Sequence, residues 1–295
     1  MPDARLDELP VVTPPLLRDW PLPDPDGSKD AKGRLLVVGG SDRTPGAVLL
    51  AAEAALRVGA GKVQVATTAS TAAHLATAVP EAFVVGLDTA DGEIATSAAE
   101  QLLELADAAD AVLAGPGIGD PAAACALLEA LVPHLRTTLV VDALGTAYLT
   151  AHPDGVSHLA DRTLLTPNAT ELAEMLHEDE SGVDDALAAT RRAATATGVT
   201  VLSGSEVSYV VEAEGRAWRV EVGSPGTAVA GSGDVKAGAV AGLLARGATP
   251  AQAAAWGAYL HGRAGERLTA SVGRVGFLAR EVAAELAHAL AEVEA

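Results

Sequence analysis

A glycine-rich turn holds the residue with the clearest chemistry in this sequence. Residues 229–238 read VAGSGDVKAG, so Asp234 follows Gly231, Ser232 and Gly233 and precedes an alanine-rich run. Consecutive backbone N–H groups at the start of a helix can bind an anion. A carboxylate beside them can take a proton from a substrate hydroxyl while the N–H groups hold the phosphoryl group under attack. We therefore predict that Asp234 is a catalytic base. The alternative is that it only caps the helix, a role that needs no flexible residues before it.

Further polar or glycine-rich segments follow the predicted strands. They are GGSDRTPGA (39–47), GPGIGD (115–120), DALG (142–145), TPNATE (166–171) and SGSE (203–206). Each alone is consistent with an ordinary turn. In open α/β sheets, however, ligands bind beyond the carboxyl ends of the strands. Five such segments at one sheet edge, together with the turn before Asp234, predict a site there.

The elements that must position this site alternate along the chain. Predicted strands are short apolar runs, at 34–40, 62–67, 82–87, 111–117, 137–143, 162–168 and 199–204. Their nearly continuous apolar character indicates burial on both faces, as in a parallel sheet. Predicted helices cover 45–59, 121–135, 169–177, 233–246, 250–270 and 276–293, and 206–222 alternates like an edge β-hairpin. We expect an α/β fold with a mainly parallel sheet flanked by helices on both faces, formed by one domain (33–295) after an N-terminal arm (1–32).

Composition and charge exclude several classes of function. The 295 residues are 49% hydrophobic and only 3% aromatic, and the net charge is −19. Nucleic-acid binding needs a basic surface, so this acidic chain is not expected to bind nucleic acid. Cys125 is the only cysteine, which excludes an intrachain disulfide and a thiolate metal cluster. We interpret it as a small buried residue on a helix. We find neither a signal peptide nor a transmembrane run, and expect a cytoplasmic protein without membrane contacts.

The ordered motifs resemble one known family. The segments KGRLLVVGGSDRTPGAVLLAAEAALRVGAGKVQVAT, GPGIG, VVDALGTAYL, LLTPNATEL and GSGDVKAGAVAGLLARGA, spanning about 30–290, look like the ADP-dependent NAD(P)H-hydrate dehydratases of the ribokinase-like superfamily. The resemblance implies repair of NADH or NADPH that has gained water at C6 of the nicotinamide ring. ADP would phosphorylate that hydroxyl, and loss of phosphate would restore the double bond, leaving AMP and inorganic phosphate. It also implies Mg²⁺ and a homotetramer. The 32 residues before the domain are too few for the epimerase domain often fused to such enzymes, so we expect a separate epimerase.

The resemblance also assigns roles to individual residues. It implies that Asp234 is the base and that Gly231, Ser232 and Gly233 form the anion hole. Predicted substrate-binding residues are Ala47, Gly117, Asn168 and Asp234, and predicted nucleotide-binding residues are Ser203, Gly204, Ser205, Glu206, Val207 and Gly233. Glu171 is expected to orient a water bound to magnesium, since Mg²⁺ prefers hard oxygen ligands. Asp142, at the same sheet edge, either assists or only forms a turn.

Three positions depart from the family pattern. Asn168 stands where the family often has histidine, Ser203 where a lysine often precedes Gly204, and Lys236 where an apolar residue is usual. Lys236 could supply the charge lost at Ser203, or it could be a solvated lysine of the first helical turn.

Two other functions remain open at this point. One is a ribokinase-like kinase of a small alcohol such as a vitamin precursor, which would not need the GGSDRTPGA loop. The other is a nucleotide-binding regulator without catalysis, against which Asp234 argues. A Rossmann dehydrogenase is set aside because GGSDRTPG lacks the G-x-G-x-x-G spacing.

Overall fold

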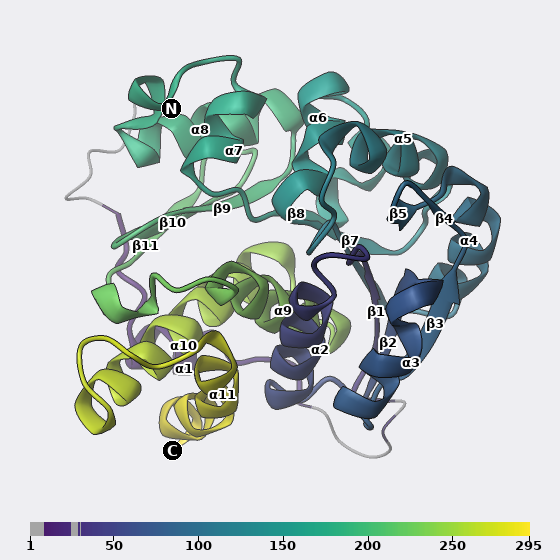
Figure 1. Cartoon of the computed structure of the whole chain (residues 1–295). Coiled ribbons are helices and arrows are strands. Elements are labelled where there is room, and N and C mark those ends of the chain that lie inside the picture. Colours follow the sequence, from purple (N-terminus) through teal and green to yellow (C-terminus); the bar gives the residue numbers. More distant parts are fainter. Residues whose placement is uncertain (1–8, 25–28, 30) are drawn as a thin grey trace.

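A nine-stranded sheet forms the centre of the molecule (Figure 1). The computed structural model describes residues 9–24, 29 and 31–295. Within them the strand order is β11-β10-β9-β8-β7-β6-β1-β2-β3. The parallel strands are β1 (Arg34–Val38), β2 (Lys62–Thr68), β3 (Phe83–Leu87), β6 (Ala111–Ala114), β7 (Thr138–Val141), β8 (Thr163–Leu165) and β9 (Thr200–Gly204). The hairpin of β10 (Ser208–Val211) and β11 (Ala217–Val220) extends one edge in antiparallel fashion.

Helices cover both faces of this sheet, as Figure 1 shows. One layer contains α1 (Pro14–Asp19), α2 (Gly46–Arg57), α3 (Ala69–Ala78), α9 (Ser232–Ala245), α10 (Pro250–Ser271) and α11 (Ala279–Glu294). The other contains α4 (Ala99–Asp107), α5 (Pro121–Leu131), α6 (Ala147–Ala151), α7 (Ala169–Met175) and α8 (Ala186–Thr197). The predicted fold class is confirmed.

The period of two along β1 explains why the central strands are apolar throughout. Leu35 and Val37 belong to the core on one face, and Leu36 and Val38 belong to the core on the other. Successive strand residues point to opposite faces, so a strand covered on both sides needs apolar residues at every position. The edge strand β3 departs from this expectation, because Phe83 is 62% exposed.

Several elements were not predicted. They are α1, α3, α4, α6, α8 and a small antiparallel sheet of β4 (Thr89–Ala90) and β5 (Glu93–Ile94). The helix α3 reads ASTAAHLATA and α8 reads ALAATRRAATAT, so both carry serine or threonine residues of modest helix propensity. Packing on the sheet stabilises them, since Leu75 and Leu187 are buried.

The described part of the N-terminal segment packs against the C-terminal helices. The Val12 N–H donates to the Arg219 carbonyl at 2.8 Å, so the segment pairs with β11. The Trp256 Nε1–H donates to the Trp20 carbonyl at 2.9 Å, and the Trp20 ring stacks on Trp218. Residues 1–8, 25–28 and 30 of the predicted arm lie outside the described residues. The division into an arm and one domain at residue 32 stays a prediction.

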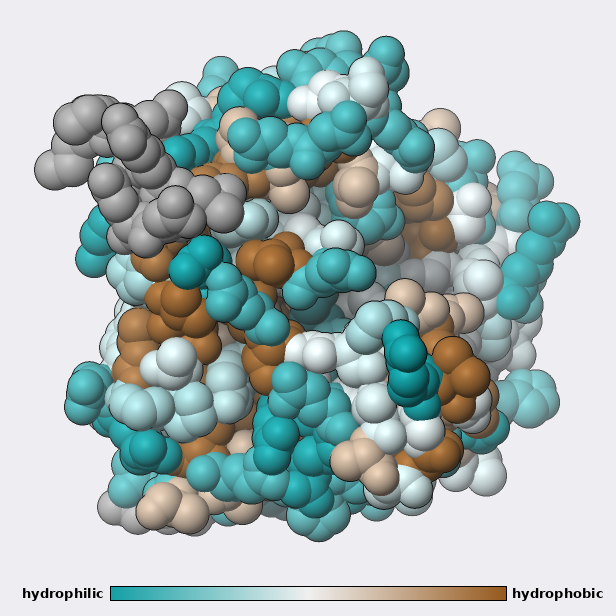
Figure 2. Space-filling model, turned by 90° about the vertical axis from the view of Figure 1, so that its left-hand side faces the viewer, coloured by the Kyte–Doolittle hydropathy of each residue, from teal (hydrophilic) through white to brown (hydrophobic). Residues whose placement is uncertain are grey.

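The surface carries apolar residues in separate patches. On the side that Figure 2 shows, hydrophobic residues alternate with hydrophilic ones. No helix among the described residues combines the length and apolar character that crossing a bilayer would require.

Candidate active site

The loops at the carboxyl ends of the parallel strands hold one another by hydrogen bonds. The loop after β1 contacts the loop after β6, and the loop after β8 contacts both the end of β7 and β9. The donors and acceptors are Gly40 N–H to Pro116 O (2.7 Å), Thr44 Oγ1 to Gly117 O (2.6 Å), Thr166 Oγ1 to Asp142 Oδ1 (2.5 Å) and Ser203 Oγ to Pro167 O (2.9 Å). Segments far apart in sequence therefore meet at one sheet edge.

The helix α9 begins at this edge with a turn that only glycine fits. Gly231 is the N-cap residue and has φ +87°, in the left-handed region. A Cβ there would lie 2.4 Å from Leu50 Cδ1 and 3.3 Å from Ala279 Cβ. Gly233 and Asp234 follow in the first helical turn, where N–H groups have no carbonyl of the helix behind them. These N–H groups are available to an anion.

Asp234 is half-buried in this first turn. The helix has no side-chain cap hydrogen bond, so Asp234 does not act as its cap. Burial raises the pKa of Asp234 from 3.8 to about 6. A carboxylate with a pKa near the working pH is a suitable general base, because it is ionised and still basic enough to accept a proton.

Asp142 lies at the end of β7 and is buried, with only 6% of its surface exposed. Its pKa is raised to about 8, mainly by burial, and the negative charges of Glu171 and Asp234 act in the same direction against the hydrogen bond from Thr166. Asp142 is thus coupled electrostatically to both carboxylates. Asp142 therefore lies close enough to Glu171 and Asp234 for their charges to affect its pKa.

Asn168 and Glu171 form a reciprocal capping box at the start of α7. Asn168 Oδ1 accepts the Glu171 N–H at 2.9 Å, and Glu171 Oε2 accepts the Asn168 N–H at 2.9 Å. Asn168 Nδ2 also donates to Glu171 Oε1 at 2.7 Å. The asparagine thus fixes both carboxylate oxygens. Burial raises the pKa of Glu171, and Asp234 contributes to the rise while Lys236 opposes it.

A pocket of about 600 Å³ opens on one side of the α9 N-terminus. We call it the hairpin pocket, because residues around the start of β10 and the end of β11 line it. Its lining includes Ser205, Glu206, Val207, Gly233 and Lys236. Four of the predicted nucleotide-binding residues are therefore brought together.

The other two predicted nucleotide-binding residues are not part of the pocket lining. Ser203 is only 1% exposed, its hydroxyl donates to the Pro167 carbonyl, and neither Ser203 nor Gly204 lines the hairpin pocket. The Ser203 side chain is therefore directed into the protein interior. The roles of both residues in nucleotide binding stay predictions.

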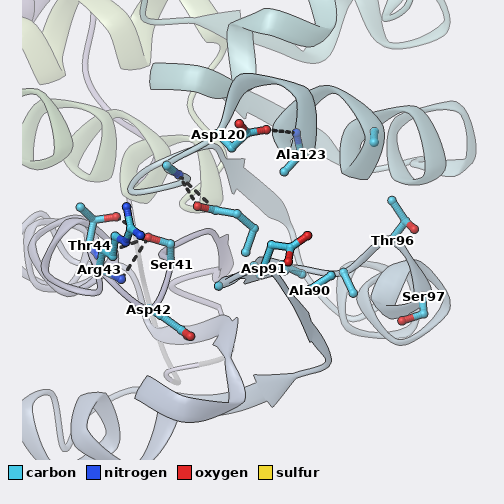
Figure 3. Close-up of a pocket in the computed structure, with 16 residues that line it drawn as sticks. Ser41, Asp42, Arg43, Thr44, Ala90, Asp91, Thr96, Ser97, Asp120 and Ala123 are labelled. Atoms are coloured by element: carbon cyan, nitrogen blue, oxygen red, sulfur yellow. Dashed lines mark hydrogen bonds between the residues drawn. The ribbon is translucent and has the colours of Figure 1, made fainter.

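Ala47 and Gly117 pack against one another. A Cβ on Gly117 would lie 2.8 Å from Ala47 Cβ and 2.6 Å from the Thr44 carbonyl oxygen, and Gly117 has φ +70°. Beyond them opens a hollow of about 1020 Å³, lined by 41–44, 90–97, 119–120 and two alanines of α5 (Figure 3). The two predicted substrate contacts thus lie next to Thr44, a lining residue of this larger pocket.

Comparison with known proteins identifies the family. A family model described as NAD(P)H-hydrate dehydratase matches residues 35–288. The chain is 42% identical over 280 residues to the ADP-dependent (S)-NAD(P)H-hydrate dehydratase of Xanthomonas campestris, covering 94% of each chain. This chain belongs to the NAD(P)H-hydrate dehydratase family.

Solved structures support the fold of this family member. A ribokinase-like superfamily protein from Enterococcus faecalis aligns with a TM-score of 0.82 and 25% identity, covering 96% of each chain. The Bacillus subtilis ADP/ATP-dependent NAD(P)H-hydrate dehydratase, co-crystallised with ATP/Mg²⁺, aligns with a TM-score of 0.78 and 24% identity over 97% of this chain and 99% of that one. The ribokinase-like fold is confirmed, and the small-alcohol kinase is not favoured.

His261, on α10, was missed by the sequence analysis. Its Nε2 lies 2.8 Å from the Ser232 Oγ of the predicted anion hole, and it lines the hairpin pocket. Burial and then the Lys236 ammonium lower the pKa of His261 to about 3, so the imidazole is neutral at physiological pH. No local motif marks this residue, because its partner lies 29 positions away.

Lys236 is half-buried rather than solvated. Burial lowers its pKa, and the opposing effect comes from Asp142 and Glu171. The lysine lines the hairpin pocket beside Gly233. Its ammonium therefore lies between carboxylates of the site and the space predicted for the nucleotide phosphates.

Replacing Lys236 by leucine is expected to raise the KM for ADP about tenfold, with a smaller change in kcat, because a charge-assisted contact to phosphate is lost. Steady-state kinetics with ADP as the varied substrate would measure this. Arg136→Leu serves as the control, since it removes a cation whose side chain is 82% exposed and outside the site. Unchanged ADP kinetics in Lys236→Leu would mean that the lysine only balances the charges of Asp142 and Glu171.

Proposed function

We propose that this protein uses ADP to dehydrate the (S)-hydrates of NADH and NADPH, releasing NADH or NADPH, AMP and phosphate. The observation that carries this proposal is the 42% identity, over 94% of both chains, to a dehydratase of that description. The geometry is compatible with it, because the reaction needs sites for two nucleotides beside one base. One pocket is lined by Ser232 and Gly233 of the helix turn that holds Asp234, and the other is lined by Thr44, which contacts Gly117.

The residues of the site have distinct roles in the transfer of the phosphoryl group. Asp234 takes the proton from the ring hydroxyl, and that oxygen attacks the β-phosphorus of ADP. The bond between the β-phosphorus and its bridging oxygen breaks, so AMP leaves. The N–H groups at the start of α9 hold the phosphoryl oxygens, where charge develops during transfer. Phosphate is a better leaving group than hydroxide, so its loss with a proton from the neighbouring ring carbon restores the double bond.

The site suits Mg²⁺. Asp142, Glu171 and Asp234 offer hard oxygen atoms of the kind that this ion takes, and burial raises the pKa of all three. These oxygens do not all lie within 4.8 Å of one another, so water molecules would complete the coordination. A cation beside them would offset the cost of ionising them together. Glu171, held by Asn168, would orient a water of the ion, and the ion when bound would neutralise phosphate charge.

Of the remaining features of the proposal, the homotetramer follows the family resemblance, and the others follow the composition and hydropathy of the sequence. The enzyme works as a homotetramer in the cytoplasm, on small-molecule substrates, and without nucleic acid or membrane. The net charge of −19 supports the exclusion of nucleic acid.

The test is incubation of the purified protein with hydrated NADH, Mg²⁺ and either ADP or ATP. We expect recovery of the near-ultraviolet absorbance of NADH, with one AMP and one phosphate formed for each NADH, and a higher rate with ADP than with ATP. Equal or higher rates with ATP would contradict the donor assignment. Formation of a stable phosphorylated alcohol without NADH would instead indicate a kinase.

The pH dependence of kcat/KM is expected to fall on the acid side with an apparent pKa of about 6, the value of Asp234. The base acts only when ionised, so protonating it removes activity as the pH falls through this value. Measurement between about pH 4.5 and 8 would test this. A profile that stays flat below pH 6, in protein shown by circular dichroism to be folded there, would exclude Asp234 as the base.

A further inference from the structure

We propose that the larger pocket receives the adenosine half of the hydrated dinucleotide and that its carboxylates make the enzyme prefer hydrated NADH to hydrated NADPH. This inference rests on the proposed function. We call this space the acidic pocket, defined by the loop 41–44, the segment 90–97, Gly119, Asp120 and the α5 residues Ala123 and Ala126 (Figure 3).

A series of contacting residues links the acidic pocket to the catalytic centre. Leu50 of α2 lies against Gly231, three residues before Asp234. One helical turn before Leu50, Ala47 packs against Gly117. Thr44, whose hydroxyl donates to the Gly117 carbonyl, already lines the acidic pocket. A dinucleotide with its nicotinamide ring at Asp234 would pass Ala47 and Gly117 and reach this pocket.

The two pockets differ in size in the way that the two substrates do. The hairpin pocket has about 600 Å³ and the acidic pocket about 1020 Å³. The hairpin pocket contains Ser205, Glu206 and Val207 and fits the smaller nucleotide, ADP. The acidic pocket remains for the larger dinucleotide, whose adenosine half extends beyond the reacting ring.

Charge in the acidic pocket is strongly one-sided. Four carboxylates line it, those of Asp42, Asp91, Glu93 and Asp120. The one cationic group among the lining residues is the guanidinium of Arg43. Burial raises the pKa of Glu93, and the negative charges of Asp120 and Asp42 raise it further, which shows that these carboxylates affect one another. The hydrogen bond from Gly119 and the charge of Arg43 lower the pKa of Glu93. A phosphate entering this space would meet like charge. The 2′-phosphate of NADPH is the group that distinguishes it from NADH.

Asp91 is the carboxylate best placed to bind a ribose hydroxyl. Asp42 accepts a hydrogen bond from Ser70, Glu93 accepts the Gly119 N–H, and Asp120 caps α5 by accepting the Ala123 N–H. Within the described residues Asp91 has no such partner. It occupies the turn between β4 and β5 with φ +53°, a conformation that aspartate tolerates better than most residues.

The chemistry of dinucleotide recognition supports this reading of Asp91. A carboxylate on the ribose 2′-hydroxyl favours the form without a 2′-phosphate, whereas an arginine accommodates the phosphate. Arg43 adjoins Thr44, the residue that contacts Gly117, so it lies at the end of the pocket nearest the catalytic centre. There it would face the pyrophosphate, which both dinucleotides share.

The experiment compares kcat/KM for hydrated NADH and hydrated NADPH at low ionic strength with ADP and Mg²⁺. We expect the wild-type enzyme to prefer hydrated NADH by about tenfold or more, the effect of a few like charges in a hydrated pocket. The pair Asp42→Asn and Asp91→Asn should reduce that ratio severalfold by speeding the NADPH reaction. The pair Glu100→Gln and Glu104→Gln, at exposed positions of α4 outside the pocket, changes the net charge by the same amount and should leave the ratio unchanged.

Two further readouts separate the pocket from the whole acidic surface. Arg43→Gln should raise the KM for both dinucleotides by a similar factor and leave the ratio unchanged. Equal wild-type rates with both hydrates, or preference for hydrated NADPH, would overturn the inference while leaving the proposed function intact. If neither hydrate reacts, the proposed function fails, and the selectivity of the pocket is then tested by measuring the binding of NADH and NADPH. Tighter binding of NADH that is lost in the Asp42→Asn and Asp91→Asn pair would support the selectivity, and equal binding of the two dinucleotides would overturn it.

Discussion

Replacing Asp234 by asparagine is expected to lower kcat/KM for the hydrated dinucleotide by about two to four orders of magnitude. Asparagine has the same shape but cannot accept the hydroxyl proton. The fold should be kept, because Asp234 does not cap α9 and its burial already disfavours the charged form. Spectrophotometric assay and thermal unfolding of the same preparation would measure both effects.

Asp161→Asn is the matched control for this substitution. It removes a carboxylate whose side chain is 85% exposed and lies outside both pockets, so activity should be unchanged. An Asp234→Asn protein that remains active but unfolds at a lower temperature would show that the residue has a structural role only. Loss of activity together with an unchanged unfolding temperature supports the base.

Replacing Gly231 by alanine is expected to lower kcat about a hundredfold, the scale of losing an oxyanion-hole donor, and to lower the unfolding temperature. Two physical causes act together. Alanine disfavours φ +87°, and its Cβ would lie 2.4 Å from Leu50 Cδ1. The turn must move, and the N–H groups of the first helical turn move with it. Activity and thermal unfolding are again the measurements.

A second substitution separates the two causes. In Gly231→Ala with Leu50→Ala the contact with Leu50 is removed while the unfavourable φ remains, so part of the loss should be recovered. Gly215→Ala is the control for backbone conformation alone, because Gly215 has φ +91° and a Cβ at that position would meet no atom within 4 Å. That variant should be slightly less stable and fully active. Full activity in Gly231→Ala would show that the anion hole does not depend on this turn.

The sequence by itself determined the fold class and the position of the predicted base. Both depend on local patterns. Apolar residues at every position of β1 after Arg34 required a strand covered on both faces, and Gly231-Ser232-Gly233 before Asp234 specified the start of a helix. The order of the motifs was sufficient for the family, which the comparisons confirmed. The predicted roles of the individual site residues remain to be tested by the experiments above.

Only the tertiary structure decided which side chains share one environment. It placed His261 against Ser232, directed the Ser203 hydroxyl into the interior, and left Lys236 half-buried near Asp142 and Glu171. It also brought the turn at Asp91 beside the loop that holds Asp42, which created the acidic pocket. The physical reason is that backbone conformation follows from neighbouring residues, whereas desolvation and charge coupling depend on segments that meet only in the folded chain.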